Sequence, residues 1–395
     1  MKTQELDYDI IIVGGGPGGS TAGYILNKLG FKVLIIDKNK FPRDKLCGGL
    51  ITKKTLKLHT RIYDETEENL ENNNIINYKS NQYKIFYKKK LLLEKSSDIP
   101  FYFVERIAYD NYLIKKARET GVKIIENNRV KSVNLQNSEI ITENKNRFRA
   151  KFIIGADGTN SIVRKQVFQN NNTDKRKWQK NLATAFEIYI KHKDTNCTVD
   201  HPAIYFGYVN FGYSWIFPNK DKILIGMGGL QKKNKQNLMD QLNNFLSDLN
   251  IEQNGQVNVK AHTVPYGNYL MNPALNNTAL IGDAAGFADP IIGEGIYYAQ
   301  RSGELVACAI NNCIKQNQDL KTAYLDLLHE HIYPELSGAK RARLLLYCIQ
   351  DKFHFYPTKL LFHFYDKKLI ELVHGKRSYK NLRKGGEMDG KIQFH

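Results

Sequence analysis

The sequence predicts an α/β protein in which an antiparallel-sheet domain is inserted into a parallel-sheet domain, and a helical C-terminal region follows. Three observations predict this class. An apolar strand near the N-terminus runs into a glycine-rich turn and a helix. Two later apolar strands end in loops rich in glycine and aspartate. Between these two strands lie shorter segments in which polar and apolar residues alternate, as they do in antiparallel sheets.

The first stretch, residues 8–37, has the form of a Rossmann-type dinucleotide-binding unit. Tyr8–Val13 is almost wholly apolar, as expected of a strand buried on both faces of a parallel sheet. A helix is predicted over Ser20–Gly30 and a second strand over Lys32–Ile36. Asp37 ends that strand, at the interval of roughly twenty residues from which an acid binds a ribose hydroxyl. The turn between strand and helix has the spacing G-x-G-x-x-G, which lets the backbone approach a pyrophosphate; its candidate residues are Gly14, Gly16, Pro17, Gly18 and Gly19.

Length and composition indicate a globular protein with more than one domain. The chain has 395 residues, of which 42% are hydrophobic, and no apolar run approaches the roughly 20 residues of a membrane span. Its five cysteines are scattered and form no C-x-x-C pair, which favours a reducing compartment and argues against a metal site. The polar residues before Tyr8 leave no room for a signal peptide. We therefore expect a cytoplasmic protein.

The formal net charge of +18 has two interpretations. Lysines are spread over the whole chain beside many asparagines, which favours a solvated basic surface. Diffuse positive charge also suits an anionic membrane surface or an anionic lipid substrate, so peripheral contact with a membrane stays open. No nucleic-acid-binding motif accompanies the charge, and nucleic acid is not expected as a partner.

Two further candidates lie outside the dinucleotide-binding stretch. A loop contains Cys47-Gly48-Gly49, and two glycines let the backbone approach a ligand closely. Cys47 is therefore either a functional thiol or a small buried residue. Arg106 stands between a predicted strand and a predicted helix, Ala108–Thr120. There it either reaches a cofactor phosphate or forms a surface salt bridge.

Two later strands repeat the plan of the first. One runs into Gly155-Ala-Asp-Gly158, with a helix capped by residues 159–161 behind it. The other ends at Gly282 and Asp283, and the loop Gly293-Glu-Gly295 then leads into a helix that begins at Ile296. Because ligands of open parallel sheets bind beyond the carboxyl ends of the strands, all three loops are expected at one crevice.

Together these three segments resemble the flavoprotein superfamily of the p-hydroxybenzoate hydroxylase fold, with its G-x-G-x-x-G, D-G and G-D motifs. The resemblance implies a Rossmann-type FAD-binding domain. It implies that Asp283 binds the ribityl chain of FAD and that Asp157 and Gly158 lie along the cofactor groove. It also places the loop from Gly293 to Gly295 at the N1–C2=O edge of the flavin, where backbone N–H groups and a helix dipole stabilise the reduced form.

The region between the second and third motifs is expected to select the substrate. Antiparallel strands are predicted over residues 184–190, 203–208, 213–217 and 222–227. With the Cys47 loop and the third motif, Gly212-Tyr-Ser-Trp-Ile-Phe-Pro218 resembles the geranylgeranyl reductase family, which carries a Y-x-W-x-F-P motif and a C-x-G-G-type loop. In that family these residues line a tunnel that holds an isoprenoid chain against the flavin. The resemblance therefore implies Cys47 and Gly48 beside the cofactor, and as substrate-binding residues Tyr213, Trp215, Phe217 and Pro218.

This division sets the expected domain boundaries. The FAD-binding domain is expected over residues 1–60, 101–180 and 278–330, and the substrate-binding domain over residues 61–100 and 181–277. The helical C-terminal region, residues 331–395, either caps the tunnel mouth as a docked tail or faces a membrane. The Cys47 loop continues Leu50-Ile-Thr instead of the family's more usual Ser-Pro-Arg, which leaves the head group of the substrate open.

The resemblance implies an FAD-dependent oxidoreductase that saturates isolated C=C bonds of an isoprenoid chain. Reduced flavin would deliver hydride from N5, and an acid or water held near Cys47 would supply the proton. Cys47, Gly293 and Gly295 are thus the catalytic candidates. The electron donor is open among ferredoxin, a quinol and NAD(P)H. Three alternatives stay open: a monooxygenase or halogenase of the same fold, an electron-transfer flavoprotein, and a lipid-binding protein that keeps FAD structurally.

Overall fold

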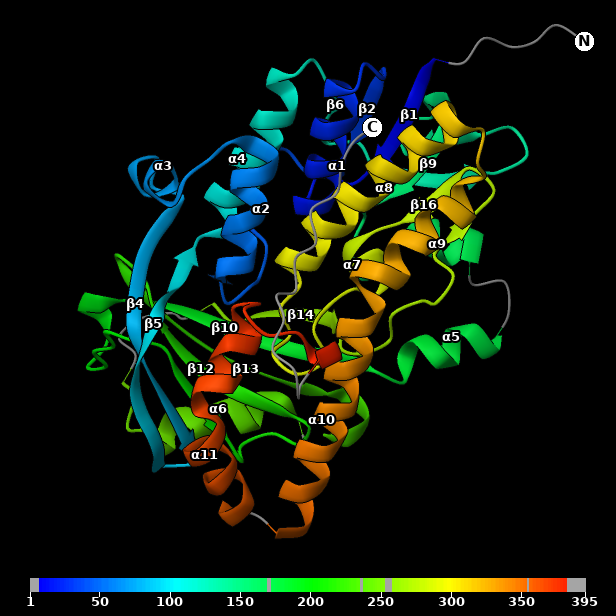
Figure 1. The fold of residues 1–395 in the computed structure, drawn as a ribbon. Coiled ribbons are helices and arrows are strands. Elements are labelled where there is room, and N and C mark those ends of the chain that lie inside the picture. The colour runs from blue at the N-terminus through cyan, green and yellow to red at the C-terminus, as the bar shows by residue number, and fades with distance from the viewer. Residues whose placement is uncertain (1–6, 169–171, 235–236, 253–257, 354, 382–395) are drawn as a thin grey trace, which may run out of the picture.

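The computed structural model describes residues 7–168, 172–234, 237–252, 258–353 and 355–381. Its strands form two eight-stranded sheets. The first lies in the upper part of Figure 1 and the second in the lower part. Within the described ranges, no helix is both long enough and apolar enough to cross a bilayer.

The first sheet is parallel at its centre, with the order β15–β16–β9–β1–β2–β6. Its strands are β1 (Tyr8–Val13), β2 (Val33–Ile36), β6 (Lys123–Ile125), β9 (Arg147–Gly155), β15 (Ala274–Leu275) and β16 (Thr278–Leu280). Two further strands lie off this path: β8 (Glu139–Thr142) pairs with β9, and β7 (Val130–Asn134) pairs with β8. Val13, Gly155 and Leu280 are in register on parallel neighbours. The three predicted loops therefore open from one edge of the sheet, beside the strand at which the chain order reverses.

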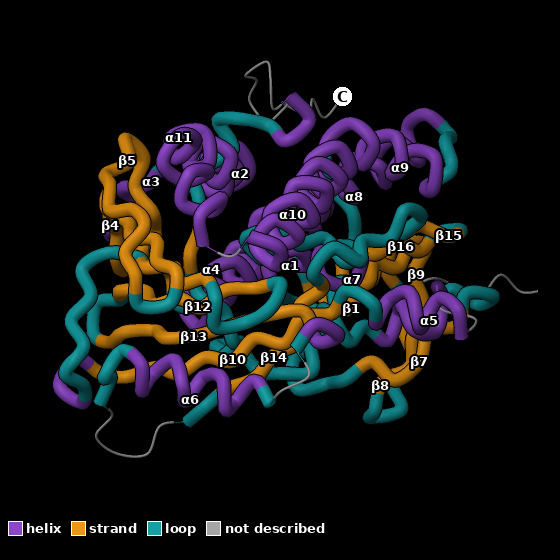
Figure 2. The backbone as a smooth tube through the Cα atoms, turned by 90° about the horizontal axis from the view of Figure 1, so that it is seen from below, coloured by secondary structure: helices purple, strands orange, loops and turns teal. Residues whose placement is uncertain are grey.

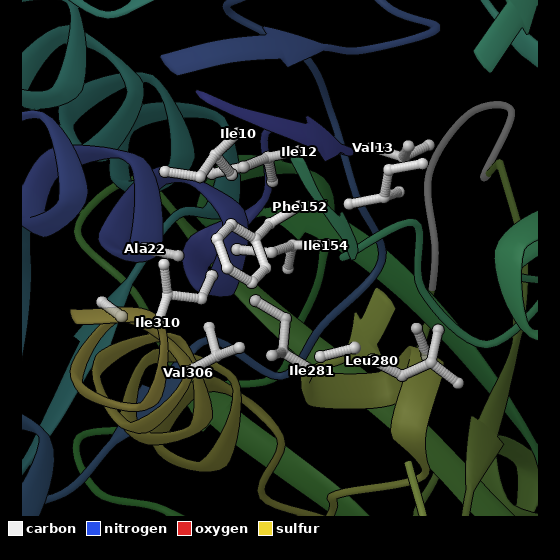
Figure 3. Close-up of a cluster of buried hydrophobic side chains, with 14 of the residues drawn as sticks. Ile10, Ile12, Val13, Ala22, Phe152, Ile154, Leu280, Ile281, Val306 and Ile310 are labelled. Atoms are coloured by element: carbon white, nitrogen blue, oxygen red, sulfur yellow. The ribbon is translucent and has the colours of Figure 1, made fainter. Parts of the chain in front are cut away.

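Helices α1 (Pro17–Lys28), α4 (Arg106–Glu119), α8 (Ile296–Gln316) and α9 (Leu320–His331) pack with this sheet into one buried core. Figure 3 shows part of it, where Phe152 and Ile154 of β9 lie near Ala22 of α1 and near Val306 and Ile310 of α8. These five side chains are at most 3% exposed. A strand covered on both faces needs no polar alternation, which explains the apolar runs in β1 and β9.

The second sheet has the order β14–β10–β13–β12–β11–β4–β5–β3. Its strands are β3 (Leu50–Ile51), β4 (Ile76–Tyr87), β5 (Lys90–Val104), β10 (Leu182–Lys191), β11 (Ala203–Phe206), β12 (Gly212–Pro218), β13 (Lys222–Leu230) and β14 (Lys260–Pro265). One face carries α6 (Leu238–Asp248), and the other faces α10 (Tyr333–Phe353) and α11 (Phe355–Val373), as Figure 2 shows. The remaining helices are α2 (Lys53–Tyr63), α3 (Glu67–Asn72), α5 (Asn172–Gln179) and α7 (Gly282–Ala285).

The fold class is confirmed, with two local differences. The inserted sheet is antiparallel except between β4 and β11, which pair in parallel because they belong to two separate segments of the chain rather than to one hairpin. The helix expected after residues 159–161 includes a π-helix, Arg164–Phe168. The division into domains stays a prediction. β3 and the end of β5 fall within the ranges expected for the FAD-binding domain, but they pair with each other in the second sheet. The helical C-terminal region is confirmed up to residue 381, and residues 1–6 and 382–395 lie outside the described residues.

Candidate cofactor and substrate site

A single cavity of about 1580 Å³ extends from the glycine-rich turn after β1 to helices α10 and α11. This volume exceeds the roughly 300–1,000 Å³ of a site for one small ligand. The cavity therefore has room for a dinucleotide together with a chain-like substrate. Its walls include most of the residues predicted for the site: Gly14, Gly16, Pro17, Gly18, Asp37, Cys47, Gly48, Arg106, Asp157, Gly158, Gly282, Asp283, Gly293, Gly295, Ile296, Tyr213, Trp215 and Phe217.

The turn between β1 and α1 shapes the nucleotide end. Gly19 does not line the cavity but lets α1 press onto the turn, since a Cβ atom there would lie 1.9 Å from the carbonyl oxygen of Gly14. Gly16 is different, because the nearest atom to a Cβ there is Nη2 of Arg43, at 3.5 Å. This open space belongs to the cavity, and α1 begins beside it at Pro17. Backbone without side chains and a helix N-terminus suit a phosphate group.

Carboxylates and basic side chains line the rest of this end. Asp37 accepts the backbone N–H of Gly15 and of Asn39, each at 2.8 Å, so its carboxylate is already oriented. Lys45 approaches Asp283, with 3.4 Å between Nζ and Oδ2. Such a mixture fits a bound dinucleotide, whose ribose hydroxyls take carboxylates and whose phosphates take cations.

Arg106 forms no surface salt bridge, so that alternative is wrong. Its guanidinium is buried and makes two contacts of 2.7 Å with the carboxylate of Asp110, four residues along α4. Asp110 also receives Arg43, at 3.1 Å between Nη2 and Oδ2. The charge of Arg106 at the cavity wall is therefore fixed by a buried partner one helical turn away. Whether it reaches a cofactor phosphate stays a prediction.

The loop before α8 presents backbone to the cavity. Gly293 and Gly295 both line it, and α8 begins at Ile296 with Gly295 as its N-terminal cap. The turn is held by Asp289, whose Oδ1 accepts the N–H groups of residues 291 and 292 at 2.7 and 3.0 Å. The positive end of a 21-residue helix is thus directed at the cavity, where it would stabilise negative charge.

A buried ion pair fastens this loop from behind. Glu294 accepts a hydrogen bond from Oγ1 of Thr52 at 2.9 Å and pairs with Nζ of Lys54 at 2.6 Å. Burial raises the pKa of Glu294, and the Lys54 ammonium opposes that shift. The start of α2 therefore holds the loop in place, a contact that the sequence did not predict.

The pleat of β12 decides which residues of the aromatic motif face the cavity. Side chains alternate along a strand, and Tyr213, Trp215 and Phe217 share the cavity face. Pro218 does not line the cavity, because the same alternation places it with Ile216 toward the other face. Its prediction as a substrate-binding residue is therefore corrected.

Two of these aromatic residues, Tyr213 and Phe217, also contact the cofactor end. The hydroxyl of Tyr213 donates to the carbonyl oxygen of Ile292, directly before the Gly293–Gly295 loop. Phe217 lies against the Cys47 loop, where a Cβ atom on Gly48 would be 3.1 Å from its ring. The motif therefore joins the substrate end of the cavity to the predicted flavin end.

Cys47 lies in the cavity wall rather than in a closed core. The residue is half-buried, and its Sγ accepts the backbone N–H of Gly49 at 3.5 Å. Its carbonyl oxygen accepts the hydroxyl of Tyr189 at 3.3 Å. The alternative of a simply buried cysteine is thus not what the geometry shows, although a functional role stays a prediction.

Several wall residues were missed by the sequence interpretation. The most informative is Glu187, in β10, followed by His262 on β14. A charged residue in the interior of a mainly apolar strand was the available signal. Leu369, Ile370 and Val373 of α11 complete the apolar end, and no local pattern shows that this helix crosses the sheet.

The comparisons with known proteins agree with this geometry. Residues 7–214 match the family described as FAD binding domain. An uncharacterized protein of Methanosarcina barkeri is 32% identical over 316 residues, 78% of this chain and 76% of that protein. The digeranylgeranylglycerophospholipid reductase of Methanococcus aeolicus is 26% identical over 361 residues, 88% of each chain. A geranylgeranyl bacteriochlorophyll reductase-like protein from Thermoplasma acidophilum, of known structure, has a TM-score of 0.74 at 21% identity and covers 95% of this chain and 93% of its own.

Gly16→Val is expected to abolish FAD binding without unfolding the protein. The added methyl groups would enter the space where the backbone must approach the pyrophosphate, while the nearest protein atom to a Cβ is 3.5 Å away. The purified variant should be colourless, and the melting temperature of its apoprotein should match that of the wild-type apoprotein. Gly19→Ala is the contrast, because its Cβ would meet backbone and should lower both flavin content and melting temperature. A yellow Gly16→Val protein with full flavin occupancy would refute this placement of the pyrophosphate.

Proposed function

Because the chain belongs to the FAD-binding-domain oxidoreductases, within the geranylgeranyl reductase family, we propose that it saturates isolated C=C bonds of an isoprenoid chain in a lipid or other prenyl compound. One observation carries this proposal. The cavity is continuous from the FAD end to an apolar end between the second sheet and the C-terminal helices. A long apolar substrate can therefore reach the flavin along its length.

The apolar end suits a polyprenyl chain. Such a chain offers little but hydrophobic surface, worth about 25 cal/mol for each Å² removed from water. It has few groups that polar side chains could recognise, so shape and area must hold it. The wall there consists mainly of aromatic and aliphatic side chains from strands of the second sheet and from α11. They are Tyr83, Ile85, Leu93, Phe101, Ile204, Phe206, Trp215, Phe217, Leu369, Ile370 and Val373.

When bound and reduced, FAD supplies the hydride for this reaction from its N5 atom. The residues of the chain then have three tasks. The glycine turn and Asp37 hold the nucleotide, the Gly293–Gly295 loop stabilises negative charge at the flavin edge, and the aromatic face of β12 positions the chain. Cys47 lies at the wall between cofactor and substrate ends, where a proton must arrive.

In this proposal, a separate electron donor reduces the flavin. Ferredoxin, a quinol or NAD(P)H would each reduce the flavin in a first half-reaction. The prenyl chain then reoxidises it in a second half-reaction. The two half-reactions can be measured separately, which keeps the identity of the donor apart from the identity of the substrate.

We also propose that the apolar end of the cavity opens toward a membrane. Leu344 and Leu345 of α10 are 48% and 65% exposed, and Phe364 and Tyr365 of α11 are 69% and 49% exposed. Leu345, Phe364 and Tyr365 also line the cavity, so apolar surface is continuous from its interior to the outside. Exposed basic residues accompany them on the same helices, namely Arg341, Lys367 and Lys368. Apolar side chains beside positive charge suit an anionic lipid surface.

The function is tested by reoxidation of the reduced enzyme. The FAD-loaded protein, reduced anaerobically with dithionite, is mixed with geranylgeranyl diphosphate or with a digeranylgeranyl lipid. We expect oxidised flavin to appear and the product to gain two hydrogens, measured by mass spectrometry, for each bond reduced. Reduced flavin that stays reduced with every prenyl compound would contradict the proposal and favour a binding protein. Oxygen consumption with NAD(P)H and a hydroxylated or halogenated product would favour a monooxygenase or halogenase.

Cys47→Ala is expected to slow the second half-reaction by about 10² or more, because the thiol would help to deliver or orient the proton at this wall. FAD content, melting temperature and flavin reduction by dithionite should stay at wild-type values, because none of them needs the thiol. The measurement is stopped-flow reoxidation by geranylgeranyl diphosphate. Equal rates for the variant and the wild type would assign Cys47 a packing role only.

Leu345→Glu is expected to weaken binding to vesicles of anionic phospholipid, because it places a negative charge in the exposed apolar surface. Ile314→Glu is the matched control, since Ile314 is 42% exposed near the end of α8 and does not line the cavity. Vesicle co-flotation of the three proteins compares them directly. If the wild type does not float with the vesicles, or if both variants float equally well, the membrane contact is wrong.

A further inference from the structure

Glu187 occupies the cavity face of a mainly apolar strand, β10. Along β10, Ala183, Ala185 and Glu187 line the cavity, and the alternation of the strand places Tyr189 on the same side. Ile188 and Ile190 pack on the α6 side. Glu187 is 1% exposed. A buried carboxyl group is costly to keep charged, and its position at this wall requires an explanation.

The contacts of Glu187 lead to the Cys47 loop. The hydroxyl of Tyr189 lies 3.4 Å from Oε2 of Glu187 and 3.3 Å from the carbonyl oxygen of Cys47. The backbone N–H of Cys47 also donates to the Glu187 carboxyl group. Neither of these partners carries a positive charge. Glu187 is thus placed beside Cys47, at the boundary between the FAD end and the apolar end of the cavity.

The surroundings of Glu187 favour its neutral form. Burial raises the pKa of Glu187 to about 8, although the Cys47 N–H, the Tyr189 hydroxyl, Arg106 and Lys260 all act to lower it. At pH 7 the group therefore holds a proton that it can donate. The titratable and charged groups around it come from the loop before β3, α4, β10, β12 and β14: Cys47, Arg106, Tyr189, Tyr213, Lys260 and His262.

Its neighbours are poorer sources of a proton. Burial lowers the pKa of His262 to about 4, so this imidazole is neutral near pH 7. Burial also raises the pKa of Tyr189 and of Tyr213, so both hydroxyls keep their protons. An efficient general acid has a pKa near the working pH, and Glu187 meets that condition.

From this placement we infer that Glu187 is the general acid that protonates the alkene carbon during reduction, an inference that rests on the proposed function. The hydride that reduced FAD supplies forms a C–H bond at one alkene carbon as the π bond breaks. The O–H bond of Glu187 breaks, and its proton forms the second C–H bond at the neighbouring carbon. The alkene gains two electrons, the flavin loses two, and the Glu187 carboxylate regains its proton from water.

The test compares Glu187→Gln with the wild type in the second half-reaction. Glutamine keeps the size and hydrogen bonding of the side chain but has no acidic proton. Reoxidation of the dithionite-reduced, FAD-loaded variant by geranylgeranyl diphosphate should be slower by about 10² or more, with flavin content and flavin reduction unchanged. Wild-type reoxidation should be fastest below about pH 8 and fall above it as Glu187 loses its proton, whereas the residual rate of the variant should lack this fall.

Glu94→Gln is the matched control. Glu94 lies on β5 of the same sheet, does not line the cavity and pairs with Lys84 at the surface, so its variant should keep wild-type rates. Glu187→Asp keeps the carboxyl group and should restore part of the rate that Glu187→Gln loses. If Glu187→Gln cannot hold FAD, the wild-type pH profile and the aspartate variant decide the question.

Each outcome is decisive. A Glu187→Gln enzyme with the rate and pH profile of the wild type would overturn the inference while the proposed function stands. A wild-type profile that is flat from about pH 6 to about pH 9 would overturn it as well. If the wild-type enzyme is reoxidised by no prenyl compound, the proposed function fails, and the inference fails with it.

Discussion

The structure depends on how closely α1 approaches the turn that precedes it. A Cβ atom on Gly19 would lie 1.9 Å from the carbonyl oxygen of Gly14, so this contact allows only glycine. It directs the N-terminus of α1 at the end of β1, the point where the strand order of the first sheet reverses. The parallel register of Val13, Gly155 and Leu280 then delivers the other two loops to the same edge. The nucleotide end of the cavity follows from these two constraints.

The second sheet is coupled to this end through the loop before α8. Tyr213 of β12 and Tyr266 donate their hydroxyls to the carbonyl oxygens of Ile292 and Ile291, directly before Gly293. From the other side, Lys54 and Thr52 hold Glu294 within the same loop. Strands of the second sheet and the helix α2 thus fix the backbone of this loop, at the predicted flavin end of the cavity. A rigid loop is an advantage here, because groups that stabilise a developing charge must not reorganise during the reaction.

Short-range sequence patterns predicted much of the site, and the predictions that were wrong have identifiable physical causes. The glycine spacing after β1, the aspartates at strand ends and the alternation in β12 correctly brought their residues to one cavity. Pro218 belongs to the same aromatic motif as Tyr213, but side chains alternate along a strand, so not every residue of the motif can face the cavity. Pro218 does not line it. Arg106 was assigned to the surface as one alternative because its partner, Asp110, lies one helical turn along α4, and sequence alone does not show that both are covered.

The sequence by itself determined the fold class, the FAD-binding motifs and the aromatic face of β12, because each depends on residues a few positions apart with a fixed period. The tertiary structure alone decided how β4 and β11 pair, that α11 lies across the apolar end, and that Glu187 is buried beside Cys47. These features depend on segments more than a hundred residues apart in the chain. Burial, and with it the protonation of a carboxyl group, is a property of what covers a residue, and only the assembled fold supplies that cover.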